Sequence, residues 1–299
     1  MNLKQAYQFC QDMAKSHYEN FPVASVLLPK KCRRPISVIY AFARTADDFA
    51  DEGNTTQQQR LQQLNEFSEA LEQINQRNYH GSNPIFIALT DVIDQYQLPI
   101  SLFADLLDAF KQDVVKDRYQ EFNEVSDYCR RSANPVGRLI LLLSGHPTQH
   151  QLQQSDNICT SLQLINFYQD ISQDLTESDR IYIPTQELQQ FHINEIDLNN
   201  INNDSSKLAP LLRLQYQRTH QLMLQGYELG ESLKGRIGWE IRAMTLGGIY
   251  TLQLLMRQKD QLLLTRPRLS KWLLFKIMLI SILRKYYHHK ATELLTSGY

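Results

Sequence analysis

The sequence has little glycine and little proline, with 11 and 10 residues among 299. Few positions therefore interrupt regular helices. Strict alternation of apolar and polar residues is also rare, whereas apolar residues recur every three or four positions, for example between Leu61 and Ile74. The sequence predicts an all-α fold. We expect a single domain over residues 1–299, because no composition shift, linker or repeat divides the chain.

Neither sign of charge is in excess, and cysteine is scarce. The 31 basic and 32 acidic residues nearly balance, so nothing in the charge indicates a nucleic-acid partner. The four cysteines lack any CxxC spacing, which argues against a zinc site or a disulfide framework and fits a reducing compartment. The first residues contain no apolar signal core, so we expect a cytoplasmic protein and not a secreted one.

A fingerprint for a nicotinamide cofactor is missing as well. Gly226, Gly230, Gly235 and Gly238 lie in a helical context without a preceding strand. The glycine pattern of dinucleotide-binding folds needs that strand, so we expect no nicotinamide site.

A long apolar run occurs near the C-terminus, from Trp272 to Leu283, and Lys276 interrupts it. It is too short for a transmembrane helix, which needs about 20 residues. Basic residues flank it on both sides. Two interpretations stay open: residues 262–299 form a membrane-surface helix and basic tail on anionic lipid at the inner face of the plasma membrane, or a final helix packs on the core.

What the sequence does contain is an unusual helix face between residues 40 and 52. At about 100° per residue, Tyr40, Arg44, Asp47 and Asp51 fall within roughly 60° of one another. A second face repeats the pattern on a helix expected over residues 151–174. There the side chains are Gln163, Asn166, Asp170 and Asp174.

Two acidic faces that met across a cavity would repel each other unless cations lay between them. Hard divalent ions with oxygen ligands meet that need, and Mg²⁺ is usually held by few carboxylates together with substrate phosphates. The pair of faces therefore predicts a site for Mg²⁺ and a diphosphate. The alternative is that both are ordinary solvated helix surface.

The remaining elements follow from breaks in the helical pattern. We expect Asn134–Gly137 to kink or break a helix, residues 179–184 to leave helical periodicity and fold back over the acidic site, and residues 198–204 to form an asparagine-rich loop. Helices are expected over residues 3–18, 35–52, 56–77, 84–97, 100–116, 125–144, 151–174, 207–232 and 236–260.

Five motifs in order resemble the squalene/phytoene synthase family over roughly residues 10–260. They are the runs Ser16–Pro29 and Tyr40–Asp51, Tyr128–Cys129 with Ala133 and Val136–Gly137, Gln163–Asp174, and Arg180–Pro184. The resemblance implies a prenyl synthase helical bundle with a central cavity, two or three Mg²⁺ ions and a prenyl diphosphate substrate.

The resemblance also implies roles for single residues. Asp47, Asp51, Asn166, Asp170 and Asp174 would hold Mg²⁺ directly or through water, with Asp48 in support. Arg44 and Arg180 would meet phosphate oxygens, and Tyr40 and Gln163 would line the diphosphate end. Asn20, Tyr182 and Tyr250 match positions of substrate contact, and Tyr128 a catalytic position.

Within the family the chain is most similar to the branch that makes hydroxysqualene for hopanoid synthesis, from presqualene diphosphate and water. Asn134 and Pro135 stand where most members have Ala-Gly, and Gln169 stands where most have arginine. We hypothesise that Asn134 and Gln169 help to place the water that captures the carbocation.

Two other functions stay open. A squalene, dehydrosqualene or phytoene-type synthase would condense two farnesyl diphosphates. A non-catalytic helical relative would serve as a binding or assembly protein. Intact Asp47, Asp51, Asp170 and Asp174 argue against the latter.

Overall fold

The computed structural model describes residues 1–16, 28–195, 198, 208–257 and 266–296. Within these ranges helices are the regular structure and no extended strand forms, which confirms the predicted all-α class; Arg118 and Ile181 form an isolated bridge. No helix in the described ranges is both long and apolar enough to span a bilayer. Asn20 and residues 199–204 of the predicted asparagine-rich loop lie outside the described residues.

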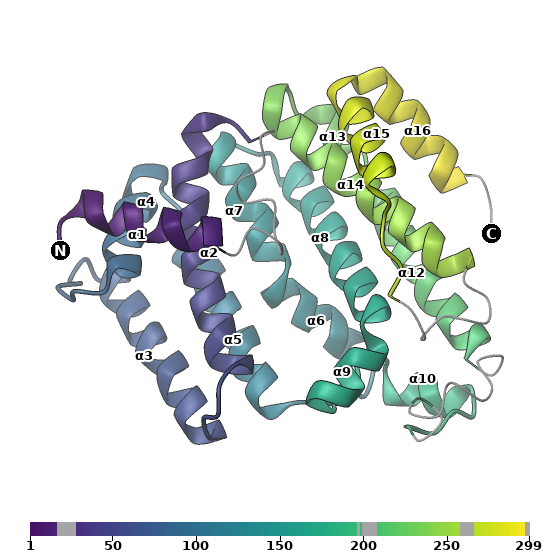
Figure 1. The fold of residues 1–299 in the computed structure, drawn as a ribbon, viewed down its shortest axis with the longest axis horizontal. Coiled ribbons are helices and arrows are strands. Elements are labelled where there is room, and N and C mark those ends of the chain that lie inside the picture. Colours follow the sequence, from purple (N-terminus) through teal and green to yellow (C-terminus); the bar gives the residue numbers. More distant parts are fainter. Residues whose placement is uncertain (17–27, 196–197, 199–207, 258–265, 297–299) are drawn as a thin grey trace. The chain divides into compact units, whose positions relative to one another are not determined.

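Contacts divide the chain into two compact units, residues 1–116 with 135–148, and residues 117–134 with 149–299 (Figure 1). The prediction of a single domain stays a prediction. The first unit holds α1 (Leu3–Ser16), α2 (Lys30–Asp51), α3 (Gln57–Asn75), α4 (Pro84–Tyr96), α5 (Ile100–Val115) and nearly all of α7 (Asn134–Ser144). The second holds α6 (Phe122–Ser132), α8 (Gln149–Gln169), α9 (Ile171–Ser178), α10 (Thr185–Gln190), α12 (Ala209–Gly226), α13 (Leu229–Ser232), α14 (Gly235–Arg257), α15 (Lys271–Ile282) and α16 (Arg284–Thr296).

The first unit is built around α2, which contacts α1, α3, α4 and α5. Its central side chain is Phe42, which is fully buried. The Phe42 ring packs against Phe67, Phe86 and Phe103 at centroid distances of 5.5 to 6.1 Å. Such offset and edge-on contacts stabilise a core beyond the area that they bury. They hold the opposite face of α2, with its acidic side chains, in place.

The start of α2 corrects a prediction. We expected this helix to begin at Pro35, because proline suits a first turn. The helix begins instead at Lys30, and Pro35 lies inside it. Proline has no N–H for the carbonyl oxygen of Lys31 one turn earlier. The hydroxyl group of Tyr96 donates to that oxygen at a long 3.5 Å, which compensates for the missing backbone bond.

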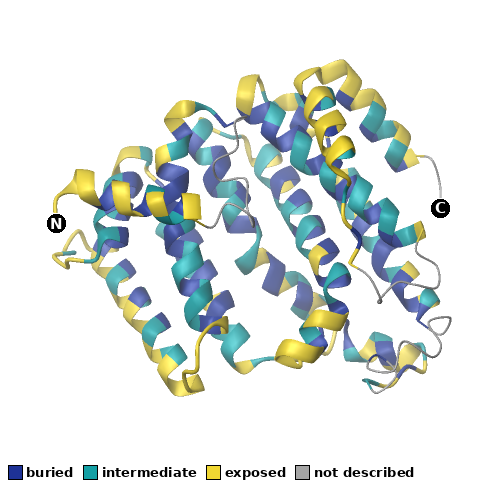
Figure 2. Cartoon of the chain, viewed as in Figure 1, coloured by how far each residue is buried: buried dark blue, intermediate teal, exposed yellow. Residues whose placement is uncertain are grey.

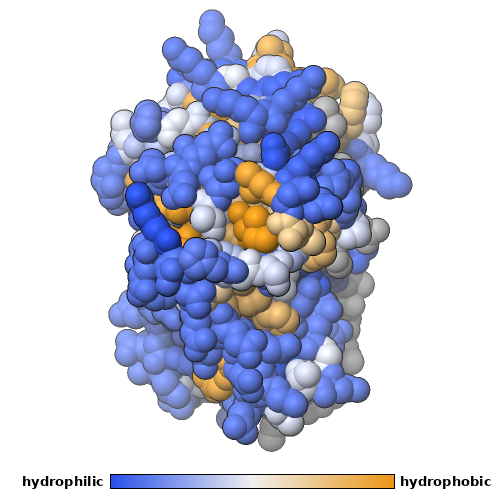
Figure 3. Space-filling view, turned by 90° about the vertical axis from the view of Figure 1, so that its left-hand side faces the viewer, coloured by the Kyte–Doolittle hydropathy of each residue, from blue (hydrophilic) through white to orange (hydrophobic). Residues whose placement is uncertain are grey.

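Polar residues cover the outer face of α3, as the glutamine-rich sequence there predicts. The helix begins after Thr56, whose side chain accepts from the backbone of Gln59 while the Gln59 side chain accepts from the Thr56 N–H. The side of the molecule that carries α1 and α3 is largely hydrophilic, with a few apolar patches (Figure 3).

The second unit is built around α8, which contacts α6, α12 and α14. The approach of α12 to α8 is close at Gly226, where a Cβ atom would lie 2.8 Å from the backbone oxygen of Gln154. Only glycine fits that distance without a shift of the backbone. Further along the same pair of helices, the hydroxyl group of Ser161 on α8 donates to the backbone oxygen of Thr219 on α12 at 3.3 Å.

The predicted helix over residues 151–174 is wrong in its continuity. It is broken at Asp170, which has φ −109° and ψ 8°, so Asp174 lies on the separate helix α9. Backbone bonds from Asp170 to Asn166 and from Asp174 to Asp170 still link the two helices. At this break, Arg266 and the backbone oxygen of Pro267 contact the side chains of Asp170 and Gln169.

Two other predicted irregularities are confirmed. The helix over residues 125–144 is broken at Ala133, between α6 and α7. Residues 179–184 leave the helix, and the N–H of Ile181 bonds to the oxygen of Asp117 at 2.9 Å.

Candidate functional site

The acidic face of α2 gathers around Arg44. The Arg44 guanidinium lies 3.3 Å from Asp47 and 2.5 Å from Asp48, and it also pairs with Glu52 at the end of the helix. These residues are one, or about two, helical turns apart, so the helix itself sets the arrangement. One guanidinium therefore serves three carboxylates, and the exposed Asp51 adds a fourth negative charge to the same end.

The excess of negative charge shows in Asp47. Its side chain is 40% exposed. Burial, and after it the nearby charge of Asp51, raises the pKa of Asp47 to about 6, while Arg44 opposes this rise. A carboxylate whose charged form is disfavoured by a second carboxylate is stabilised by any further cation. This end of α2 thus fits a divalent cation that prefers oxygen ligands.

Two buried hydrogen-bond donors on the same face of α2 indicate that a negatively charged ligand binds there as well. The hydroxyl group of Tyr40 and the Nε atom of Arg44 are buried and have no hydrogen-bond partner among the described residues. Buried polar groups are normally paired, so such donors indicate a ligand that accepts hydrogen bonds. Burial also raises the pKa of Tyr40, which keeps its hydroxyl group a donor at neutral pH.

The second acidic group lies at the end of α8 and is paired with a residue that the sequence did not indicate. Arg266 forms an ion pair with Asp170, in which Nη2 donates to Oδ2 at 3.0 Å and Nε lies 2.8 Å from Oδ1. Burial raises the pKa of Asp170, and the positive charge of Arg266 opposes the rise. Beside it, the side-chain amide of Gln169 donates to the backbone oxygen of Pro267 at 2.8 Å.

Residues 179–184 fold back onto α9, as predicted. The N–H of Arg180 bonds to the backbone oxygen of Asp174 at 3.1 Å. Asp174, Arg180 and Tyr182 line one small cavity together with the buried Phe167. The guanidinium of Arg180 donates to the Tyr182 hydroxyl at 3.3 Å. The cavity thus brings together Asp174 of one predicted motif and Arg180 and Tyr182 of the next.

An aromatic cluster adjoins this cavity. The Tyr182 ring stacks on Phe167 at 3.5 Å between centroids, and it lies 5.7 Å from Tyr128 and 5.5 Å from Tyr119. Tyr128 and Tyr182 were predicted, whereas Phe167 and Tyr119 were missed. The place of Phe167, directly after Asn166, is the signal that could have identified it. Stacked rings of this kind favour a nearby positive charge.

Other predicted residues lie elsewhere in the second unit. The buried Asn134 accepts a hydrogen bond from the hydroxyl group of Thr160 on α8 at 3.0 Å. On α8, Gln163 is partly buried and Asn166 is exposed. Tyr250 lies near α16, where Lys290 and Glu293 affect its pKa and burial raises it.

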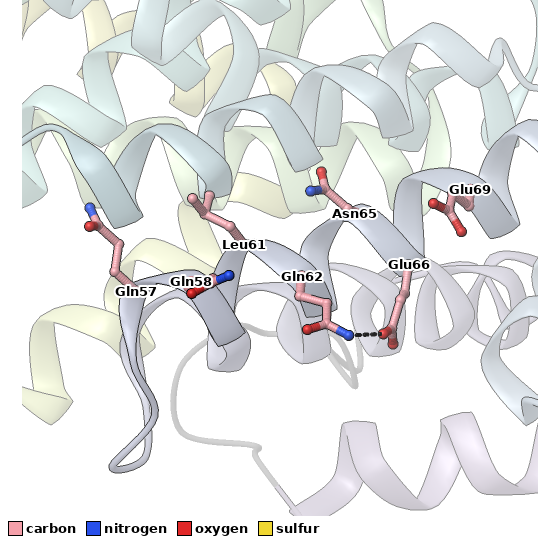
Figure 4. Close-up of a pocket in the computed structure, with 7 residues that line it drawn as sticks. All are labelled: Gln57, Gln58, Leu61, Gln62, Asn65, Glu66 and Glu69. Carbon is pink, nitrogen blue, oxygen red and sulfur yellow. Dashed lines mark hydrogen bonds between the residues drawn. The ribbon is translucent and has the colours of Figure 1, made fainter.

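A shallow pocket on α3 lies apart from all predicted residues. Its lining is the polar outer face of the helix, where Gln62 donates to Glu66 at 3.2 Å (Figure 4). In the described part of the chain, no group of three or more histidine, cysteine or acidic side chains is arranged to hold a metal ion.

Fold and side chains together define an all-α protein whose helices carry carboxylates and guanidinium groups, with a wall of aromatic rings in the second unit. The family model for squalene/phytoene synthase matches residues 14–273. The chain belongs to the squalene/phytoene synthase family, whose members process prenyl diphosphates and generally depend on Mg²⁺.

Curated relatives include more than one branch. The chain is 34% identical to hydroxysqualene synthase of Rhodopseudomonas palustris, over 75% of this chain and 74% of the relative. It is 28% identical to phytoene synthase of Mycobacterium tuberculosis, over 84% and 82%. Among solved structures it is similar to squalene synthase of Alicyclobacillus acidocaldarius, with 32% identity, a TM-score of 0.79 and coverage of 86% and 95%.

Proposed function

We propose that the protein is a cytoplasmic, Mg²⁺-dependent enzyme that converts presqualene diphosphate and water into hydroxysqualene and diphosphate. The observation that carries this choice is the higher identity to hydroxysqualene synthases, 34% over 224 residues, than to phytoene synthases, 28% over 254 residues. The Asn134 and Gln169 departures point to the same branch. The reaction balances: the bond from carbon to the diphosphate oxygen breaks, and water supplies the hydroxyl group and releases a proton.

Three of the predicted side chains would donate to the diphosphate. The Tyr40 hydroxyl group and the Arg44 Nε atom are buried donors that have no hydrogen-bond partner among the described residues. Arg180 supplies a guanidinium group beside Asp174. Asp47, Asp51, Asn166, Asp170 and Asp174 would hold Mg²⁺, with Asp48 in support. When bound, Mg²⁺ supplies electrostatic stabilisation of the departing diphosphate.

Arg266 supplies a positive charge that the sequence motifs did not predict for this protein. Gln169 removes the arginine that most of the family has at this position, and Arg266 brings a guanidinium to the neighbouring carboxylate. We assign Arg266 to the diphosphate end of the site. There its guanidinium group would release Asp170 and bind phosphate oxygens instead. Bidentate arginine contacts suit both partners equally well.

Water capture is assigned to Asn134. Its oxygen is occupied by Thr160, so the amide group is fixed in orientation and its nitrogen is left to donate to a water oxygen. The rings of Tyr128, Tyr182 and Phe167 would shield the carbocation from other water. Gln169 bonds to Pro267 and would act by holding that segment in place.

A second candidate is the condensation of two farnesyl diphosphates to squalene or to a conjugated triene. The similarity to the squalene synthase of Alicyclobacillus acidocaldarius and to phytoene synthases favours it. The full chain should be incubated with Mg²⁺ and either presqualene diphosphate or farnesyl diphosphate, followed by extraction and mass spectrometry. Hydroxysqualene from presqualene diphosphate alone supports the proposal. Turnover of farnesyl diphosphate would move the protein to the condensing enzymes, and no turnover of either would favour a non-catalytic relative.

A further inference from the structure

The C-terminal helix α15 is held firmly on one side. Ile277 and Ser281 are its buried residues. The buried Arg242 of α14 donates to the backbone oxygen of Ser281 at 2.5 Å and to that of Gly230 at 2.6 Å. In α16, the fully buried Tyr287 donates to the oxygen of Tyr227 at 2.6 Å. The orientation of α15 is therefore fixed by specific contacts.

The other side of α15 is largely exposed (Figure 2), and its large side chains there are apolar. Six of them are 40% to 73% exposed: Trp272, Leu274, Phe275, Met278, Leu279 and Ile282. At about 100° per residue they span an arc of roughly 160°. Leu283 and Tyr286, just after the helix, extend the same apolar surface with exposures of 53% and 65%. A contiguous patch of this size on a folded protein marks an interaction surface.

Positive charge surrounds this surface. Residues 261–292 contain seven lysines and arginines and no aspartate or glutamate, although the whole chain has a net charge of −1. Lys271 and Lys276 lie on α15 itself and are exposed, and Arg284 and Lys285 follow its end. The partner that fits this combination is apolar at its centre and negatively charged at its edge. A bilayer with anionic headgroups has that composition.

We propose that α15 docks this protein on an anionic lipid bilayer, with the helix in the plane of the interface. Twelve residues of helix extend about 18 Å, which is well short of the roughly 30 Å of a hydrocarbon core. A second copy of the chain fits less well, because a two-fold contact through this face would bring the same cations together. The proposal stands on exposure and charge and does not depend on the reaction.

Co-sedimentation of the full chain with vesicles tests the proposal. We expect binding to vesicles of phosphatidylcholine with about one third phosphatidylglycerol, little binding to phosphatidylcholine alone, and loss of binding as salt is raised. Phe275→Glu with Leu279→Glu should reduce binding at least tenfold. The matched control is Val115→Glu, because Val115 is 59% exposed on α5 outside the surface, and it should bind normally.

Tryptophan fluorescence places the contact. The chain has two tryptophans, so Trp239→Phe leaves Trp272 as the sole reporter. We expect a blue shift with anionic vesicles that is absent with phosphatidylcholine. Equal binding to both vesicle types, or no binding to either, would overturn the proposal. A third result would also overturn it: the wild type is a dimer that binds no vesicles, and Leu279→Glu converts it to a monomer. The surface would then join two copies of the chain.

Discussion

Arg266 and Asp170, 96 positions apart in the sequence, form an ion pair at the break between α8 and α9, with one hydrogen bond of 3.0 Å. The pair joins a carboxylate predicted to bind metal with a cation that no motif indicated. Asp170 is 21% exposed and Arg266 is 46% exposed, so solvent reaches the pair and it can be exchanged. In the proposed function, this pair is the resting state of a site that later holds Mg²⁺ and diphosphate.

Replacing Arg266 should therefore affect the two ligands in opposite directions. In Arg266→Ala, Mg²⁺ alone should bind more tightly, because it no longer competes with a guanidinium for Asp170. Diphosphate in the presence of Mg²⁺ should bind about tenfold more weakly, because one charge-assisted contact is lost. Titration calorimetry measures both. Arg268→Ala is the matched control, since Arg268 is exposed two residues away; equal effects of the two changes would contradict the assignment.

Asp47 should make stability depend on pH. Its pKa in the folded state is about 6, above the usual value near 4, so protonation stabilises the fold as the pH falls from about 6 to about 4. Above pH 6 this contribution is lost. Asp47→Asn mimics the protonated state and should raise the melting temperature by about 2 °C at pH 7.5 without Mg²⁺, with a smaller gain at pH 5.

Calorimetry at pH 7.5 and pH 5 measures the difference in melting temperature between the wild type and Asp47→Asn. The control is the same measurement with Mg²⁺ and diphosphate added. The two ligands should stabilise the wild type more than Asp47→Asn, because binding to the folded state adds stability. A melting temperature that falls in the variant at pH 7.5 without ligands would show that the carboxylate stabilises the fold, contrary to this account.

The pair of Asn134 and Thr160 should control the product. With Asn134→Gly, the share of alcohol formed from presqualene diphosphate should fall and hydrocarbons should appear, because the donor to water is gone. Thr160→Val, which frees the Asn134 amide to rotate, should give a smaller change, whereas Thr160→Ser keeps the hydroxyl group and should behave as the wild type. Mass spectrometry measures the ratio of alcohol to hydrocarbon products in each variant. An unchanged share of alcohol in Asn134→Gly would show that Asn134 does not place the water.

Gly226 should be required for the packing of α12 on α8. Gly226→Ala places a methyl group 2.8 Å from the Gln154 oxygen and should lower the free energy of unfolding by about 1 to 3 kcal/mol. Gly247 is the matched control, because a Cβ atom there meets nothing within 4 Å on the helix α14. Gly247→Ala should be neutral or stabilising by up to about 1 kcal/mol. Equal denaturation midpoints for the two variants would contradict the packing argument.

The fold class and most helices could be predicted from periodicity and breaks, and the two acidic groups from their spacing. The start of α2 could not, because the carbonyl oxygen that Pro35 leaves without a backbone partner is contacted by Tyr96, a distant residue. At the break at Asp170, the contacts come from Arg266 and Pro267, which are equally distant. Local patterns report on a single helix, whereas these features are set by contacts between segments remote in the sequence.

The most direct test of the proposed reaction is turnover of presqualene diphosphate in water enriched with ¹⁸O. We expect hydroxysqualene whose mass is two units higher than in ordinary water, because the hydroxyl oxygen comes from solvent and the carbon–oxygen bond of the diphosphate is the one that breaks. An alcohol without the heavy isotope would mean that oxygen is retained from the diphosphate. That result would contradict capture of a carbocation by water.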